Sequence, residues 1–241
     1  MQRPKMIIFD YGHTLLWEKD FDFRRGYRAI FEHISKNPNG VTSDEMQELA
    51  EGIFDDVQVC RANGFEIHEF PLLRCASEAL GVGFDIPIED VEDILWTNAS
   101  SGDKMPHISD LLAYLKNEGI RTGVISNIGW SGGALKRRIE RLLPDGDFEF
   151  IITSSEYAVR KPNPLIFKAA LQKAGLKPDE VWFCGDNISS DIIGAHGAGI
   201  FPVYYDCPAE KDPFAKSDTA PDFDYLHIHD WRELIDILKD L

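Results

Sequence analysis

Residues 6–15 read Met-Ile-Ile-Phe-Asp-Tyr-Gly-His-Thr-Leu, and this stretch decides the fold. Its first four residues form a continuous apolar run that stops at Asp10. A run that is apolar at every position, rather than at alternate positions, is typical of a strand buried on both faces of a sheet. Further strands are predicted at residues 120–126, 148–152, 181–184 and 200–204.

Helical patterns fill the intervals between these strands. Leu165–Ala174, for example, follows Pro164 and stops at Gly175, which are residues that favour the beginning and the end of a helix. The other helices are predicted at 108–117, 134–143, 191–197 and 231–241. Strands that alternate with helices indicate an α/β fold, in which helices cover both faces of a parallel sheet.

One long segment, residues 17–101, departs from this alternation. It shows little strand signal, and its periodicity predicts four helices, at 23–35, 43–63, 72–80 and 88–99. We therefore expect an all-helical cap at residues 17–101. It would be inserted after the first strand of a core that residues 1–16 and 102–241 form.

The composition limits the possible partners. The chain has 25 basic and 41 acidic residues and a net charge of −16, which repels nucleic acid and anionic lipid, so we expect neither as a partner. No apolar run approaches the ~20 residues of a membrane span, and the run after Lys5 is too short for a secretory signal. The four cysteines lack CxxC spacing, which argues against a disulfide scaffold or a zinc site and predicts a reducing cytoplasm.

Polar residues stand at the carboxyl ends of predicted strands or just before a helix. They are Asp10, Ser126-Asn127, Lys161, and Gly185-Asp186 with Asp191. Taken singly, such residues usually form turns or helix caps, or are simply solvated. Taken together they would meet at one edge of a parallel sheet, which is where ligands bind in α/β folds.

In their order and their residues these four motifs resemble those of the haloacid dehalogenase-like superfamily of hydrolases. The resemblance covers nearly the whole chain, because the helical insertion falls where that family places its C1 cap. It implies a Rossmann-like core, a Mg²⁺ cofactor and an aspartyl-phosphate mechanism. The implied activity is that of a phosphatase on a small phosphorylated metabolite, such as a sugar phosphate or a nucleotide.

The resemblance also implies which residues bind the metal. Asp10 would be the nucleophile, and with Asp186 and the backbone carbonyl of Gly12 it would bind Mg²⁺, a hard cation that prefers oxygen ligands. Asp191 would accept hydrogen bonds from metal-bound waters or from Lys161.

A second set of residues would hold the phosphoryl group. The resemblance assigns this role to Ser126, Asn127 and Lys161, and it makes Ser126 and Lys161 part of the catalytic machinery. The Lys161 ammonium and the metal would also offset the net charge of −16 for an anionic substrate.

Gly12 departs from the family's phosphatases, which carry a second Asp two residues after the nucleophile. That Asp protonates the leaving group and then activates water, whereas a glycine cannot transfer a proton. His13 is one residue later and has an unperturbed pKa of ~6.5, so it is a candidate substitute acid, although it could equally serve only in the loop. Without such an acid the chain could be a metal- and phosphate-binding module of low activity.

Haloacid dehalogenases proper also lack the second Asp and form another alternative. They need neither a leaving-group proton nor a metal. Gly185-Asp186 differs from the Ser-Asn wording associated with dehalogenases at the fourth motif, and the loop at 9–14 differs in register from theirs. The phosphatase interpretation therefore comes first.

Two further patterns carry competing interpretations. Gly129–Gly133 fits the G-x-S-x-G nucleophile elbow, but Ser131 stands five residues past the predicted strand end, so we expect these glycines to shape a loop. His227 and His229 have the spacing of one strand face and could bind a metal, but the sequence shows no third ligand beside them. In the cap, Arg24 and Arg25 are candidates for contact with a substrate anion.

Overall fold

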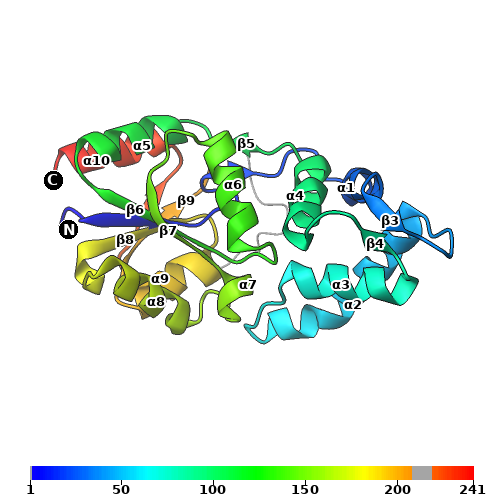
Figure 1. Ribbon diagram of the computed structural model, residues 1–241. Helices are drawn as coiled ribbons and strands as arrows, with labels where there is room; N and C mark the ends of the chain where they lie inside the picture. The colour runs from blue at the N-terminus through cyan, green and yellow to red at the C-terminus, as the bar shows by residue number, and fades with distance from the viewer. Residues whose placement is uncertain (1, 208–218) are drawn as a thin grey trace.

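The computed structural model describes residues 2–207 and 219–241, and its centre is a parallel sheet (Figure 1). The sheet has six strands in the order β10-β9-β8-β1-β6-β7, and every neighbouring pair is parallel. The strands are β1 (Met6–Phe9), β6 (Arg121–Ser126), β7 (Phe148–Thr153), β8 (Val181–Gly185), β9 (Phe201–Tyr205) and β10 (Leu226–Ile228). The predicted α/β fold is confirmed. Strand β10 lies outside the prediction, because three residues are too few to carry a pattern.

Helices cover both faces of this sheet because its central strands are apolar on both sides. Ile7 and Phe9 of β1 belong to a buried cluster with α5, α6 and α10, whereas Met6 and Ile8 belong to a second cluster with α8 and α9. Figure 1 shows these two sets of helices above and below the sheet. Their bounds are α5 (Ile108–Asn117), α6 (Gly132–Leu142), α7 (Ser154–Tyr157), α8 (Pro164–Ala174), α9 (Ile193–Gly197) and α10 (Trp231–Lys239).

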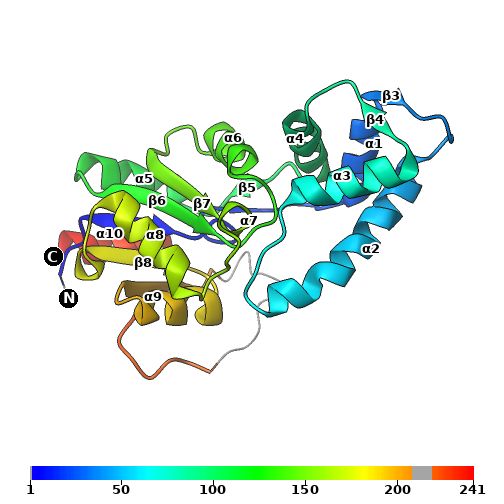
Figure 2. The same cartoon turned by 60° about the horizontal axis from the view of Figure 1, so that its bottom comes forward.

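Four more helices lie together on one side of the sheet, as Figures 1 and 2 both show. They are α1 (Phe23–Phe31), α2 (Ser43–Ala62), α3 (Glu69–Leu80) and α4 (Ile88–Ala99). The capping box at the start of α2, in which Thr42 and Glu45 exchange hydrogen bonds, is a local signal that fixes this helix boundary.

The expectation of an all-helical segment at 17–101 is incomplete, because an antiparallel ribbon joins α1 and α4. The ribbon pairs β3 (Ile34–Lys36) with β4 (Gly83–Phe84), so α1 ends at Phe31 and not at Ser35. Pro38 disfavours helix in the residue before it, and the pairing with β4 satisfies backbone groups that a helix would otherwise use.

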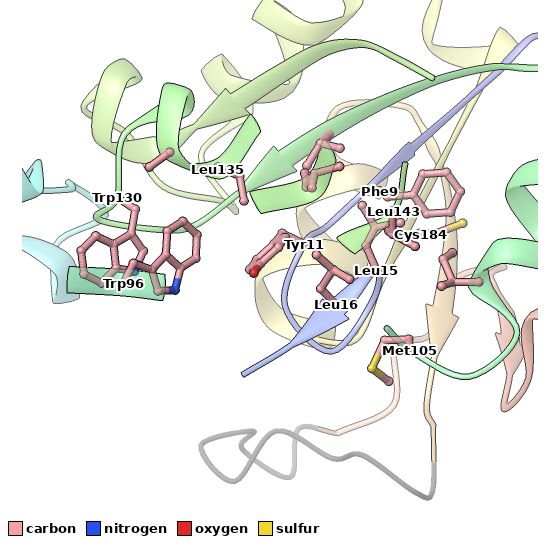
Figure 3. Packing of buried hydrophobic residues seen from close by; sticks show 14 of the residues in the cluster. Phe9, Tyr11, Leu15, Leu16, Trp96, Met105, Trp130, Leu135, Leu143 and Cys184 are labelled. Carbon is pink, nitrogen blue, oxygen red and sulfur yellow. The ribbon is translucent and has the colours of Figure 1, made fainter. Parts of the chain in front are cut away.

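The chain passes between sheet and helices α1–α4 at two neighbouring places. Leu16–Trp17 (β2) and Asp103–Lys104 (β5) pair as an antiparallel ribbon, close to the boundaries predicted at residues 16/17 and 101/102. Near this crossing Trp96 of α4 stacks on Trp130, with ring centroids 5.0 Å apart (Figure 3). Among the helices in residues 2–207 and 219–241, none combines the length and apolar character that crossing a membrane requires.

Candidate active site

All the residues predicted to form the site line one pocket of about 420 Å³. They are Asp10, Gly12, His13, Ser126, Asn127, Lys161, Asp186 and Asp191. The parallel sheet brings them together because β1, β6 and β8 are neighbours and end at the same edge. Residues that the sequence did not single out complete the wall, chiefly Glu18, Trp96, Trp130 and Arg160.

Lys161 lies between two carboxylates in this pocket. Its Nζ is 2.5 Å from Oδ1 of Asp10 and 2.7 Å from Oδ1 of Asp191, and all three residues are buried. The N–H of Asp10 donates to the carbonyl of Cys184 on β8 (2.8 Å), which fixes the start of the loop after β1. Buried charges are costly unless they are paired, and here each charge has an opposite partner.

These contacts set the protonation of the trio. Burial raises the pKa of Asp10 to about 6; the Asp191 carboxylate adds to this effect, and the Lys161 ammonium opposes it. Burial lowers the pKa of Lys161, but the two carboxylates outweigh burial and the net shift is upward. At neutral pH Lys161 is therefore a cation and Asp10 mainly an anion, as a carboxylate nucleophile must be.

Asn127 positions the loop that carries Lys161. Its side-chain oxygen accepts from the N–H of Lys161 (2.7 Å), and its side-chain nitrogen donates to the carbonyl of the same residue (2.9 Å). These bonds tie the end of β6 to the Lys161 loop. The contact of Asn127 with a phosphate stays a prediction. Its backbone N–H could make this contact, as could the side-chain amide hydrogen that is not bonded to Lys161.

Three carboxylates converge on one point of the pocket. One oxygen each of Asp10, Asp186 and Asp191 lies within 4.8 Å of the other two. Asp191 also accepts from the N–H of Asn187 (3.1 Å), and a Cβ on Gly185 would overlap its carboxylate, which explains the glycine before Asp186. An all-oxygen donor set of this charge suits a hard divalent cation such as Mg²⁺, so the residues present fit that metal.

Gly12 and His13 follow Asp10 at the mouth of the same pocket. A Cβ added at Gly12 would meet nothing within 4 Å, so the glycine is not required by crowding. His13 has φ of 50°, an uncommon conformation for a residue with a side chain. Its N–H donates to the carbonyl of Leu16 (2.8 Å), which closes the turn.

Arg160 is a pocket residue that the sequence analysis missed. It donates to Glu66, whose buried carboxylate also pairs with Arg61 (3.1 Å) and accepts from Ser154 (2.9 Å). Its position directly before Lys161 is the sequence feature that could have identified Arg160 as a site residue. By contrast, neither Arg24 nor Arg25 is among the described residues that line the pocket, and Arg25 donates to the carbonyl of Ala99 (2.8 Å).

Ser131 has a structural role, as expected. It caps α6 by accepting from the N–H of Ala134 (3.0 Å), and its hydroxyl donates to the carboxylate of Glu92 (2.5 Å). This capped and buried serine at a helix start is not the exposed serine of a nucleophile elbow.

A smaller, mainly apolar pocket of about 190 Å³ adjoins the first. The two pockets share Asn127, Ile128 and Trp130 as a common wall. Helices α1–α3 supply most of the rest, and the remaining lining residues are Phe23, Tyr27, Ala50, Glu51, Phe54, Arg61, Glu69, Leu72 and Gly129. Burial, with some repulsion from Glu92, raises the pKa of Glu69 to about 8.

The sequence is similar to those of known hydrolases. The family model for haloacid dehalogenase-like hydrolases matches residues 88–204. The glyceraldehyde 3-phosphate phosphatase of Methanopyrus kandleri is 33% identical over 56% of this chain and 57% of its own length. The phosphoserine phosphatase of Thermus thermophilus is 29% identical over 54% of this chain and 49% of its own. The chain thus spans about half the length of the curated relatives it matches.

A solved structure extends the likeness to the whole fold. The 2-haloacid dehalogenase from Pseudomonas syringae superimposes with a TM-score of 0.62, over 98% of this chain and 99% of that one. Its sequence is 20% identical, so this likeness concerns the fold alone.

Proposed function

We propose that this chain is a member of the haloacid dehalogenase-like hydrolases and a Mg²⁺-dependent phosphatase of small phosphate monoesters. The observation that carries the proposal is the buried arrangement of Asp10, Lys161 and Asp191, with Asp186 beside it. It combines an ionised nucleophile, a fixed cation and an oxygen-rich metal position. The two relatives named above as phosphatases support the same reaction class.

Asp10 would act in two steps. Its carboxylate oxygen attacks phosphorus, the bond from phosphorus to the alcohol oxygen breaks, and the leaving alkoxide takes a proton from His13 or from solvent water. Water then attacks phosphorus, and inorganic phosphate leaves as Asp10 is regenerated. Bound by Asp10 and Asp186, the Mg²⁺ ion would neutralise charge on the phosphoryl oxygens.

Lys161 and Ser126 would hold the phosphoryl group during both steps. Lys161 is buried between Asp10 and Asp191, so its ammonium is fixed before the substrate arrives. Ser126 ends β6, is buried and lines the same pocket. The role we propose for Asp191 is to keep Lys161 charged and in place.

Proton transfer would limit the rate at this site, because Gly12 supplies no acid to the leaving alcohol and no base to the attacking water. His13 lines the pocket and is the candidate for both roles. We expect esters of acidic alcohols, such as aryl phosphates, to be cleaved best, since their leaving groups need no proton.

The adjoining pocket would receive the alcohol part of the substrate. Phe23, Phe54 and Trp130 give it an aromatic lining, and it opens beside Ile128 next to the Asp10 pocket. This lining favours a phosphate ester with an apolar or aromatic group over a short polar one. Helices α1–α3 would thereby act as the cap that selects the substrate.

Asp10→Asn tests the proposed reaction directly. The amide cannot serve as the nucleophile, so we expect turnover of an aryl phosphate with Mg²⁺ to fall to background. Asp179→Asn makes the same change at an exposed position and should keep the wild-type rate. Wild-type turnover by Asp10→Asn would reject the mechanism, whereas halide release from a 2-haloacid without metal would support the dehalogenase alternative.

The chain is also proposed to work in the cytoplasm. Cys60, Cys75, Cys184 and Cys207 are all free thiols, which fits a reducing compartment.

A further inference from the structure

Two histidines and an aspartate meet at the ends of β9 and β10, at a place separate from the Asp10 pocket. Asp206 directly follows β9, His227 lies within β10 and His229 directly follows it. Among the described residues that line the Asp10 pocket, none of these three appears. We propose that Asp206, His227 and His229 bind a divalent transition-metal ion, with Zn²⁺ as the best match.

The pairing of the two strands creates this cluster. β9 and β10 are parallel neighbours with Tyr204 opposite His227, and the N–H of Asp206 donates to the carbonyl of Ile228 (2.8 Å). His227 and His229 are two residues apart and therefore project from one face of the sheet. Asp206 thus supplies the third ligand that the histidine pair lacks in the sequence, from 21 positions upstream of His227.

The distances suit a small metal ion. Oδ2 of Asp206 is 3.4 Å from Nε2 of His227 and 3.9 Å from Nδ1 of His229, and one donor atom from each residue lies within 4.8 Å of the other two. Ligand atoms around a tetrahedral zinc are about 3.3 Å apart, given metal–ligand bonds of about 2.0 Å. Small side-chain rotations would therefore complete the site.

The surroundings hold both rings beside Asp206. In the metal-free chain Nδ1 of His229 donates to the backbone carbonyl of Asp206 (3.0 Å), a bond that a metal ion bound to this nitrogen would replace. The His227 ring packs on Tyr204 with centroids 4.8 Å apart. The side chains of the two histidines are 42% and 55% exposed, so an ion can reach them from solvent.

The donor set separates this site from the Asp10 pocket. Two imidazole nitrogens and one carboxylate favour Zn²⁺ and its neighbours, whereas Mg²⁺ prefers oxygen ligands alone. With three protein ligands, the remaining coordination position would be filled by water. The two clusters should therefore bind different metals from the same solution.

Zn²⁺ at this place would link two distant parts of the sequence. Asp206 directly follows β9 and His227 lies within β10, so the ion would tie the ends of two neighbouring strands together. An ion that binds the folded chain in preference to the unfolded chain stabilises the fold in proportion to its concentration and affinity. The expected consequence is a melting temperature that rises with Zn²⁺ and falls back with a chelator.

The test is a titration of the full-length chain with Co²⁺ and with Zn²⁺ in excess Mg²⁺, which would occupy the Asp10 pocket under the proposed function. We expect one equivalent to bind with an affinity on the order of micromolar, and bound Co²⁺ to show the visible absorption of nitrogen ligation. His227→Gln and His229→Gln should each weaken binding at least about tenfold, and Asp206→Asn should also weaken it.

Two controls keep the result specific. His33→Gln changes a histidine of the α1–β3 turn and should leave Zn²⁺ binding unchanged, as should Asp186→Asn in the Asp10 pocket. Since the ligand side chains are partly exposed, the metal-free variants should melt like the wild type, and only the Zn²⁺-induced rise should disappear. Unchanged affinity in His227→Gln and His229→Gln, or no binding at micromolar metal, would overturn the proposal.

Discussion

The Asp10 pocket and the adjoining aromatic pocket differ in how the chain builds them. The paired charges of the Asp10 pocket come from the loop after β1 (Asp10), the loop that leads into α8 (Lys161) and the helical turn Ile188–Ile192 after β8 (Asp191). The aromatic pocket is built largely by α1–α3, which are not part of the sheet. Under the proposed function, the sheet edge would carry the reaction, whereas the inserted helices would select the substrate.

The two pockets also differ in their electrostatics. Lys161 compensates Asp10 and Asp191 at contact distance, which keeps a buried carboxylate ionised near neutral pH. Glu69 in the aromatic pocket sits in an environment dominated by burial and by repulsion from Glu92, and its pKa rises to about 8. The Asp10 pocket therefore holds an ionised carboxylate, whereas the carboxyl group of Glu69 in the aromatic pocket is mainly neutral.

Among the substitutions that test the difference between the two pockets, Gly12→Asp should have the largest effect. A Cβ added at Gly12 meets nothing within 4 Å, and the new carboxyl group would supply the acid and base that glycine cannot. We expect turnover of an alkyl phosphate to rise about 10²-fold, and turnover of an aryl phosphate to rise less, because its leaving group needs no proton. Steady-state kinetics with both esters measures the difference.

Gly12→Asn is the matched control, with the same size and no titratable group. It should stay at the wild-type rate. A folded Gly12→Asp variant whose rates stay flat would mean that proton transfer does not limit this enzyme.

Phe54→Ala tests the aromatic pocket and should act on binding rather than on chemistry. Removing the ring should raise KM for an aryl phosphate about tenfold, or about 1.4 kcal/mol, with little change in kcat. KM for a short polar ester should not move. Val59→Ala, on the exposed side of the same helix, should change neither constant. An equal rise for both esters would contradict a leaving-group pocket.

Glu69→Gln should have the smallest effect, on the pH dependence of stability. The folded state keeps Glu69 protonated up to about pH 8, whereas the unfolded chain ionises near the ordinary value of 4.5. Wild type should therefore lose at least about 1 kcal/mol relative to Glu69→Gln as the pH rises from 5 to 8. Urea unfolding of both proteins across this range measures the change, and a constant difference would rule out a neutral Glu69 carboxyl group in the folded state.

Most of the fold was accessible from the sequence because the sheet is buried on both faces. The central strands β1 and β8 are therefore buried at every position, and helix ends such as Pro164 and Gly175 are marked by residue type. The ribbon β3–β4 was not accessible, because its short strands are defined by their pairing across 46 or more residues and not by a local pattern.

The site likewise contains some residues that the sequence predicts and others that it does not. Asp10, Lys161 and Asp191 were predictable because each follows a recognisable strand or opens a recognisable helix, and parallel strands end together. Arg160, Glu69 and the contact of Trp96 with Trp130 depend on how α1–α4 pack against the sheet edge, which periodicity does not encode. For the same reason Asp206 could not be assigned to His227 and His229 before β9 and β10 were seen as neighbours.

The most direct test of the central claim is to trap the covalent intermediate on Asp10. The chain is mixed with an aryl phosphate and Mg²⁺, quenched in acid within the first turnover, and analysed by peptide mass spectrometry. Because Gly12 provides no base for the attacking water, we expect the phosphoryl group to accumulate on the peptide that contains Asp10, and less of it in Gly12→Asp. Release of phosphate at the full rate, with no phosphoryl group on Asp10 at any time, would contradict the account.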